Sequence, residues 1–435
     1  MRRILIVGAG QAGLHLALGL LKNGYDVTVV SNRTPEQIRD GRVTSSQAMF
    51  GTALGHERDL GLDHWPHCPP IEGIQFTVPA PGGGRAIDWA GLLHEPARSV
   101  DQRLKMPAWL DEVEKAGGKI VIHDAAPADL ETYAAQYDLV LVASGKGPIA
   151  SLFERDAARS PYATPQRALA LTYVHGLAPR PGHSAVCFNL IPGVGEYFVF
   201  PALTLGGPCE IMVFEGVPGG PMDCWGDVRT PAEHLARSRS ILETFLPWEA
   251  ERCAGIELTD GLATLTGRFA PTVRRPVAVL PSGAPVLGVA DVVVLNDPLT
   301  GQGAGNAAKC AATYLAAIVE RGDRVFDRAW MERTFECYWE GAGRAATEWT
   351  NALLAPPPPH VLKLLGAAGS LPEIASRFVN GFDDPSDFAS WFMDPAGAAA
   401  YLARAGTERA LTERARAERV GAERVGAEQM GTERS

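Results

Sequence analysis

Three glycines near the N-terminus have the spacing that phosphate binding requires. Gly8, Gly10 and Gly13 form a GxGxxG motif directly after an apolar run over residues 3–7. The first glycine permits a tight turn, the second lets the backbone approach a pyrophosphate, and the third lets a helix pack on a sheet. The start of that helix would supply N–H groups and a positive dipole to the phosphates. The residues predicted to contact a dinucleotide here are Gly8, Gly10, Gln11, Ala12 and Gly13.

A second glycine-rich turn lies far downstream. Asp291 ends a candidate strand, and residues 297–303 (DPLTGQG) open a candidate helix. A carboxylate at a strand end can bind a ribityl hydroxyl, and a glycine-rich helix start can bind a flavin phosphate or the flavin's pyrimidine carbonyl. Two such turns from opposite ends of the chain favour one long ligand, and FAD is a ligand of that kind. The predicted contacts in this turn are Asp291, Pro298, Gly301, Gln302 and Gly303.

The adenosine end of the predicted site lacks a usual feature. An acidic residue is expected about 20 residues after the glycine motif, where it binds the ribose hydroxyls, but Ser31, Asn32 and Arg33 stand there. Arg33 could bind a 2′-phosphate or simply lie in a solvated loop. No second GxGxxG stands between a strand and a helix, so we expect no separate nicotinamide-binding domain.

Continuous apolar runs predict the elements that position these turns. Residues 3–7, 27–30, 119–122 and 139–143 are typical of strands covered on both faces. Short runs separated by Gly and Pro turns predict a mostly antiparallel sheet, with strands over 170–174, 185–189, 197–200 and 210–214. Residues 286–295 are again typical of a buried strand, residues 300–320 form a glycine-rich turn and an Ala-rich helix, and residues 330–405 are largely helical.

This order predicts an α/β fold with a Rossmann-like FAD-binding domain, an inserted antiparallel substrate domain and C-terminal helices. The FAD-binding domain spans 1–165 plus 276–325, and the substrate domain spans 166–275 with pocket contributions from 42–78. A C-terminal helical region spans 326–405. Residues 406–435 carry Glu at every fifth position and several glycines, which predicts a disordered tail.

Composition excludes several classes of function. The chain has 435 residues, with 40 Lys and Arg against 50 Asp and Glu, so the net charge is −10. No excess of cations exists to meet nucleic acid or an anionic membrane. No apolar run is long enough to cross a bilayer, so we expect a cytoplasmic protein. The cysteines are scattered and odd in number, which predicts neither a disulfide framework nor a metal site; they are Cys68, Cys187, Cys209, Cys224, Cys253, Cys310 and Cys337.

From Arg3 to Trp391 the chain resembles the flavin monooxygenases with the hydroxybenzoate-hydroxylase-like fold. It is most similar to the oxygenase component of two-component styrene and indole monooxygenases. The matching segments are Ile6–Gly10, Ala12–Leu16, Val100-Asp101 with Arg103-Leu104, Tyr137–Leu139, Ser144–Lys146, Pro165–Leu169, Asp297-Pro298, Gly301–Ala304 and Trp349–Asn351. The chain departs from the family at Ala290, where Gly is usual, and at Asn306, one place later than the usual Asn.

The resemblance implies the chemistry. In that family, FADH2 is a diffusible co-substrate made by a separate NADH-dependent flavin reductase, which is a transient partner. Reaction with O2 gives a C4a-hydroperoxyflavin that transfers oxygen to an alkene. The resemblance further implies cofactor contacts by Arg42, Arg103 and Asn306. Because the flavin carries the reaction, we expect no catalytic acid–base pair and no metal; a homodimer stays an open alternative.

Six positions of the resemblance separate styrene-type from indole-type members. They are Ser45, Gln47, Met49, Ile71, Ile74 and Ala97, and they match the indole type. The leading interpretation is therefore epoxidation of indole at the 2,3 bond, which leads to indoxyl and indigo. The nearest alternative is a styrene epoxidase on the same scaffold. A single-component NADPH-dependent hydroxylase and a non-enzymatic flavin-binding protein stay open, whereas a halogenase is disfavoured because no WxWxIP segment is present.

Overall fold

A computed structural model of the chain describes residues 2–145, 147–407 and 409. The first of its two large sheets has the strand order β15-β16-β7-β1-β2-β6, and its pairs are parallel except β15 with β16. The strands are β1 (Arg3–Val7), β2 (Asp26–Ser31), β6 (Lys119–Ile122), β7 (Leu139–Val142), β15 (Val277–Val279) and β16 (Pro285–Gly288). The predicted Rossmann-like sheet is confirmed, and its last strands come from far along the chain.

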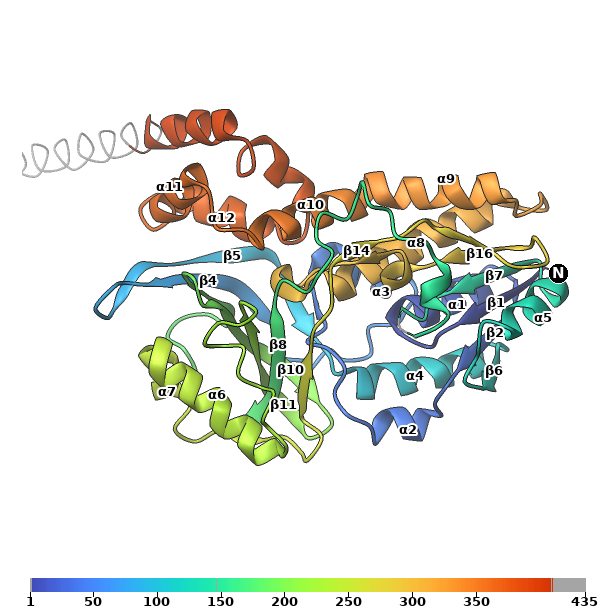
Figure 1. Cartoon of the computed structure of the whole chain (residues 1–435), viewed down its shortest axis with the longest axis horizontal. Coiled ribbons are helices and arrows are strands. Elements are labelled where there is room, and N and C mark those ends of the chain that lie inside the picture. Colours follow the sequence, from blue (N-terminus) through green and yellow to red (C-terminus); the bar gives the residue numbers. More distant parts are fainter. Residues whose placement is uncertain (1, 146, 408, 410–435) are drawn as a thin grey trace, which may run out of the picture.

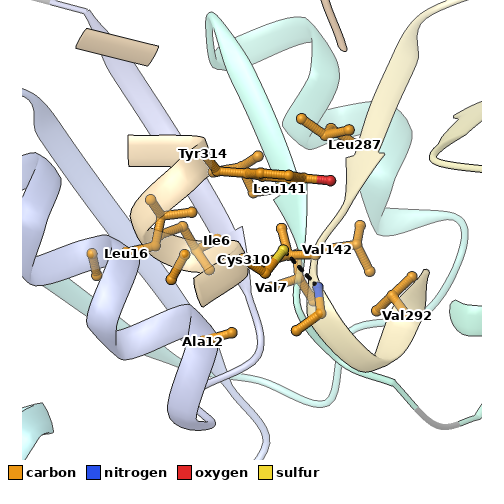
Figure 2. Close-up of a cluster of buried hydrophobic side chains, with 14 of the residues drawn as sticks. Ile6, Val7, Ala12, Leu16, Leu141, Val142, Leu287, Val292, Cys310 and Tyr314 are labelled. Atoms are coloured by element: carbon orange, nitrogen blue, oxygen red, sulfur yellow. Dashed lines mark hydrogen bonds between the residues drawn. The ribbon is translucent and has the colours of Figure 1, made fainter. Parts of the chain in front are cut away.

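Helices cover this sheet, and the two helices that follow the predicted cofactor turns pack against each other. The helix α1 (Gln11–Lys22) packs against α8 (Gly303–Arg321) and α4 (Gln102–Lys115). Figure 2 shows the apolar contact, in which Leu16 of α1 and Cys310 and Tyr314 of α8 pack beside β1 and β7. The other helices of this part are α2 (Pro35–Arg39), α3 (Gly51–Asp59), α5 (Asp129–Gln136), η1 (Ala150–Leu152) and α9 (Arg328–Tyr338).

The second sheet contains the four antiparallel strands expected from the sequence. They are β8 (Ala168–His175), β9 (Ala185–Ile191), β10 (Gly195–Thr204) and β11 (Gly207–Gly216). The sheet is extended at one side by β4 (Ile71–Pro79), β5 (Arg85–Ser99) and β3 (Ala48–Met49), and at the other by β12 (Glu257–Leu258) and β13 (Thr264–Gly267). The pair of β4 with β9 is parallel. Residues 48–99 thus supply strands to the second sheet, and the division into domains stays a prediction.

Helices lie on opposite sides of this second sheet (Figure 1). On one side are α6 (Pro231–Phe245) and α7 (Pro247–Arg252), and on the other are α11 (Pro359–Ala367) and α12 (Pro372–Asn380). An α-helix α10 (Arg344–Leu353) follows α9 through the π-helical turn η4 (Trp339–Gly343). The described part after α12 contains η5 (Pro385–Ser390) and a helical segment over 395–407. Each face of the sheet therefore has its own apolar core.

The strand predicted over 286–295 is interrupted. After β16 the chain makes a short helical turn η2 (Ala290–Val292) and then forms β17 (Val294–Leu295), which pairs with β14 (Thr272–Val273). The interruption begins at Ala290, whose φ of 51° lies in the left-handed region. A strand cannot continue through that conformation, so the single predicted strand was wrong in this respect.

The C-terminal tail and membrane-spanning helices were also subjects of prediction. The tail predicted over 406–435 lies outside the described residues, apart from positions 406, 407 and 409. Among the described helices, none combines the length and the apolar character needed to cross a membrane.

Candidate active site

The first glycine turn has room for a ligand at one position and none at the others. A Cβ atom added to Gly10 would meet nothing within 4 Å, and Gly10 caps α1 without a side-chain hydrogen bond. A Cβ at Gly13 would stand 2.0 Å from the carbonyl oxygen of Gly8, and Gly8 has a φ of 119°. Gly8 and Gly13 are therefore needed for the turn itself, whereas the space at Gly10 is open toward the uncapped N–H groups of α1.

The second glycine turn has the same open character. Asp297 accepts a hydrogen bond from the Leu299 N–H (3.2 Å) and starts η3 (Pro298–Thr300). Gly301 follows in the left-handed region (φ 63°), and Cβ atoms at Gly301 and Gly303 would meet nothing within 4 Å. The turn thus presents bare backbone at the start of α8.

One buried polar atom of this region has a hydrogen-bonding position left for a ligand. The Oδ1 atom of Asn306, in the first turns of α8, is buried and has no partner among the described residues. Gln302, by contrast, is used internally, since its amide donates to the carbonyls of Thr300 and Phe382. Asp291 lies against Gly145, where an added Cβ would come within 2.8 Å of the Asp291 Cβ. Gly8 lies against Ala143 and Asp291 against Gly145, so these two predicted contacts both lie beyond the carboxyl end of β7. Because these open glycines and the unpaired Asn306 oxygen leave room and a hydrogen-bonding group, the residues fit a flavin dinucleotide.

The departure at Ala290 has a structural consequence. A left-handed conformation is unfavourable for a residue with a Cβ atom, yet Ala290 adopts it. Its N–H donates to the Sγ of Cys310 at 3.4 Å, which is the dashed contact in Figure 2. Burial raises the pKa of the Cys310 thiol to about 12. The residue before Asp291 thus keeps the glycine-like backbone without being glycine.

Gln11 and Met49 lie together beside a buried ion pair. The Gln11 amide donates to Glu57 Oε1 at 2.6 Å, and Lys105 Nζ donates to the same oxygen at 2.6 Å. The Met49 sulfur lies 3.4 Å from Lys105 Nζ and 3.8 Å from the Gln11 amide nitrogen. The Gln11 side chain is therefore committed inside the protein, and its backbone N–H remains as the group for a phosphate. Met49 packs with Ala308 of α8.

Arg103 and Arg42 contact other parts of the protein. Arg103 is 2% exposed and donates to Asp101, Thr204 and Asp260. Burial alone would lower the pKa of Arg103, but its hydrogen bonds to Asp260 and Asp101 outweigh burial and raise it. Arg42 donates to the Thr264 carbonyl at 3.2 Å. Both arginines thus donate to residues between positions 204 and 264. Their predicted contact with the cofactor stays a prediction.

The six predicted substrate positions fall into three places. Ile71, Ile74 and Ala97 belong to one apolar core between the second sheet and the C-terminal helices, and Ile71 pairs with Ala97 across β4 and β5. Ser45 and Gln47 form a polar network beside it, in which the Ser45 hydroxyl donates to Gln47 Oε1 at 2.9 Å. Met49 lies apart from these five, as described above.

A narrow apolar cavity lies in the same core. Its volume is ≈ 30 Å³, so it has room for water but not for an aromatic ring unless lining side chains move. Ile74 is the one predicted substrate residue that lines it, and Leu299 of the second glycine turn lines it too. The other lining residues are Phe76, Phe188, Leu190, Glu196, Leu353, Pro357, Val361, Leu365, Phe378, Phe382 and Phe392.

One wall of this cavity contains the carboxyl group of Glu196, which the sequence pattern did not predict as a site residue. Glu196 of β10 stands directly opposite Glu215 of β11, and both are buried. Arg167 neutralises Glu196 through two hydrogen bonds, from Nε to Oε2 at 2.7 Å and from Nη2 to Oε1 at 2.9 Å. Two opposed carboxylates in a sheet are unfavourable unless compensated, and this arginine compensates one of them.

Glu215 of β11 and Asp297, the first residue of the second glycine turn, are two neighbouring buried acidic residues. None of the described N–H or hydroxyl groups donates to the Glu215 carboxyl. Burial, strengthened by Asp297 and Glu196, raises the pKa of Glu215 well above its ordinary value, and burial also raises the pKa of Asp297. Burial of the two acidic groups thus favours the protonated form of each. The glutamates inside the apolar strands at 195–200 and 211–216 were the available signal.

Other reactive groups form no site. Among the described residues, no cluster of His, Cys, Asp or Glu could hold a metal ion, and the seven cysteines are free. The buried thiols of Cys187 and Cys253 have their pKa raised to about 11 by burial. Cys187 and Cys253 are therefore unreactive core side chains.

Comparisons with known proteins find a matching family model and two relatives of similar length. A family model for the proposed substrate-binding domain of styrene monooxygenase A matches residues 145–252. Two relatives are named styrene monooxygenase StyA. The one from Pseudomonas fluorescens is 31% identical over 404 residues, which cover 91% of this chain and 96% of the relative. The one from a Pseudomonas species is 31% identical over 408 residues, with the same coverage of 91% and 96%.

Solved structures with the same fold include a flavin-dependent brominase and an oxygenase. The flavin-dependent brominase Bmp2 superimposes with a TM-score of 0.62 at 14% identity, covering 89% of this chain and 97% of the other. The 2-methyl-3-hydroxypyridine-5-carboxylic acid oxygenase gives a TM-score of 0.55 at 15% identity, covering 91% and 97%. At such low identity the likeness establishes the fold alone.

Proposed function

The chain belongs to the styrene monooxygenase family, and from that premise we propose that it uses FADH2 and O2 to epoxidise indole at the 2,3 bond. The reduced flavin would come from a separate NADH-dependent reductase. The membership itself makes the protein a flavin-dependent monooxygenase. The choice of indole and the supply of flavin are the proposed parts.

The observation that carries the choice of indole is a buried hydrogen-bond acceptor beside an apolar core. Gln47 is 7% exposed, and one lone pair of its Oε1 atom accepts from Ser45 while the other is unused. Indole has an N–H that can donate to such an oxygen, and styrene has no donor. One further hydrogen bond from a ring N–H to this oxygen would contribute about 0.5–1.5 kcal/mol, so a site of this kind favours the substrate with the N–H group.

The open glycine turns would hold the flavin. Gly10 would receive the pyrophosphate, Asp291 a ribityl hydroxyl, and the backbone around Gly301 and Gly303 the ring end, near the unpaired oxygen of Asn306. When bound, reduced flavin supplies the electrons that activate O2 for transfer of one oxygen atom. The chain's own part is to orient the substrate and to exclude water, and Ile74 and Leu299 supply apolar surface for this purpose.

Supply of the flavin by a separate protein is supported by two features. The described residues contain one sheet of the Rossmann type, with one glycine motif at its first turn. Ser31 replaces the usual ribose-binding carboxylate, and its hydroxyl donates to the Arg33 carbonyl at 2.6 Å in a local turn. Weak binding at the adenosine end suits a flavin that must arrive reduced and leave oxidised. Dependence on NADH made in the cell would place both proteins in the cytoplasm.

Styrene is the second candidate substrate. The relatives are named for styrene, and the cavity beside Ile74 is lined almost entirely by apolar side chains. A hydrocarbon needs no polar partner, so these observations favour styrene as directly as Gln47 favours indole.

One assay separates the candidates. The purified protein is combined with FAD, NADH, a flavin reductase and either indole or styrene, and a parallel reaction contains NADPH without the reductase. We expect product only with the reductase, and a higher kcat/KM for indole. A higher kcat/KM for styrene would select the alternative. Turnover with NADPH alone would indicate a single-component hydroxylase, and no product from either substrate would contradict the proposal.

A further inference from the structure

The segment that contains Gln47 is held in a strained conformation. Gln47 has a φ of 36°, which residues with a side chain rarely adopt, and its side chain is buried. Such a conformation persists only where the surrounding structure holds it, and it points to a functional constraint. The groups that hold it come from α4 (Gln102), β5 (Ser99) and β8 (Tyr173).

Counting hydrogens fixes the orientation of the Gln47 amide. The Tyr173 hydroxyl has one hydrogen, and it donates this hydrogen to the Ser45 carbonyl at 2.7 Å. Burial raises the pKa of Tyr173 well above its ordinary value, so the hydroxyl keeps that hydrogen. Toward Gln47, 2.7 Å away, Tyr173 can therefore only accept, and the Gln47 nitrogen must face it.

Ser99 reinforces the same orientation. Its hydroxyl donates to the Ser46 carbonyl at 2.9 Å and accepts the second amide hydrogen of Gln47 at 3.3 Å. Both hydrogens of the Gln47 amide are thus used. The Gln47 oxygen points the other way, toward the Ser45 hydroxyl, which in turn accepts from the Gln102 amide at 3.1 Å.

The consequence concerns what Gln47 can offer to a substrate. With its nitrogen held by Tyr173 and Ser99, Gln47 presents an oxygen with one unused lone pair. Without the Tyr173 hydroxyl, the amide could turn over and present N–H groups on the same side. An N–H group of Gln47 cannot form a hydrogen bond with the N–H of indole, whereas the fixed oxygen can accept one.

We propose that Tyr173 is a positioning residue for substrate choice, because its hydroxyl fixes Gln47 as an acceptor for aromatic substrates that carry a ring N–H. The proposal rests on the proposed function, in which indole-type substrates meet Gln47. The Tyr173 ring belongs to the same apolar core as Ile71, Ile74 and Ala97. Its hydroxyl acts through Gln47 and not on the substrate.

The test compares two Tyr→Phe variants in one sheet. Tyr173→Phe keeps the ring and removes the hydroxyl, and we expect the ratio of kcat/KM for indole to that for styrene to fall about fivefold, mainly through a higher KM for indole. Tyr197→Phe is the matched control, because Tyr197 of β10 is equally buried and its hydroxyl has no partner among the described residues. We expect the control to keep the ratio of the unmodified protein.

A second variant covers a failure of Tyr173→Phe to fold. Ser99→Ala removes the other acceptor of the Gln47 amide, and the ratio should fall in the same direction but less. An unchanged ratio in either folded variant, or an equal fall in Tyr197→Phe, would overturn the role of Tyr173. If the unmodified protein oxygenates neither indole nor styrene, the proposed function fails instead, so the two failures are distinguishable.

Discussion

At the scale of single residues, the raised pKa values of the buried Glu215 and Asp297 carboxyl groups make the stability of the protein depend on pH. Arg167 is committed to Glu196, so no cation of the described residues neutralises the Glu215 carboxyl directly. The pKa of Glu215 is therefore higher in the folded protein than in the unfolded chain. The free energy of unfolding must then depend on pH in a way that one substitution can remove.

The sign of this pH dependence is fixed by the raised pKa. Since the pKa of Glu215 is raised on folding, its contribution to stability is complete below the ordinary pKa of glutamate and is lost as the pH rises through the folded value. Over that window the free energy of unfolding should fall by up to about 1.4 kcal/mol per pH unit. Glu215→Gln can still donate to Asp297 and should flatten the fall.

Urea denaturation at a series of pH values measures this effect. The control is Glu243→Gln, which changes an exposed carboxylate on α6 and should leave the slope as it is. A Glu215→Gln profile that parallels the unmodified protein would show that the pKa of Glu215 is not raised on folding.

A second prediction at this scale concerns Gln47 itself. Valine would be a poor replacement, because a β-branched residue at a φ of 36° is strongly disfavoured. Gln47→Met keeps an unbranched side chain of similar length and removes the acceptor. We expect the ratio of kcat/KM for indole to that for styrene to fall about tenfold, mainly by loss of indole turnover. A ratio that stays constant in Gln47→Met and in Ser45→Ala would leave shape alone to select the substrate.

The site residues differ in how far sequence could predict them. The role of Gly10 follows from a backbone motif, because spacing alone determines where the bare backbone lies. The partners of Gln11 and Arg103 do not, since Glu57, Asp260 and Thr204 reach them only through tertiary contacts. Glu215 was missed for the same reason: its importance depends on a neighbour across the fold, Asp297.

At the scale of elements, the glycine turn between β1 and α1 separates a binding role from a packing role. An added Cβ meets open space at Gly10 and the Gly8 carbonyl at Gly13. Gly10→Val should therefore fold normally and lose flavin-dependent oxygenation, because its side chain occupies the space of the pyrophosphate. Gly13→Ala should instead lower the free energy of unfolding by about 1–3 kcal/mol.

Thermal denaturation and oxygenase assays on both variants check this difference. Near-normal activity of Gly10→Val with supplied FADH2 would mean that this turn does not bind the phosphates. A Gly13→Ala variant as stable as the unmodified protein would show that the close approach of helix and turn is unnecessary.

The elements themselves followed from hydrophobic patterns with one exception. The apolar runs at 3–7 and 139–142 and the four strands of the second sheet were predictable, because continuous or turn-bounded apolar residues leave few alternatives. The break at Ala290 was not, because alanine gives no local signal for a positive φ. Nor could the pattern show that β4 and β5 join the second sheet, since strand pairing is a tertiary property.

At the scale of the whole molecule, the proposed supply of reduced flavin by a separate protein predicts weak binding of FAD. We expect the purified protein to retain little FAD after desalting, since Ser31 gives no charged hydrogen bond to the ribose, and such a bond contributes roughly 1.5–3 kcal/mol. Absorbance at the flavin maximum before and after desalting measures the retained fraction. A yellow protein with one FAD per chain after desalting would contradict a diffusible cofactor.

We propose that this protein transfers oxygen to indole by using flavin that a separate reductase has reduced. The most direct measurement mixes the anaerobic protein with chemically reduced FAD and indole, without any reductase, and then admits ¹⁸O₂. We expect indoxyl, which dimerises to blue indigo, with one ¹⁸O atom incorporated before dimerisation and no such product when the protein is left out. Oxidation of the flavin with indole recovered unchanged would contradict oxygen transfer to indole.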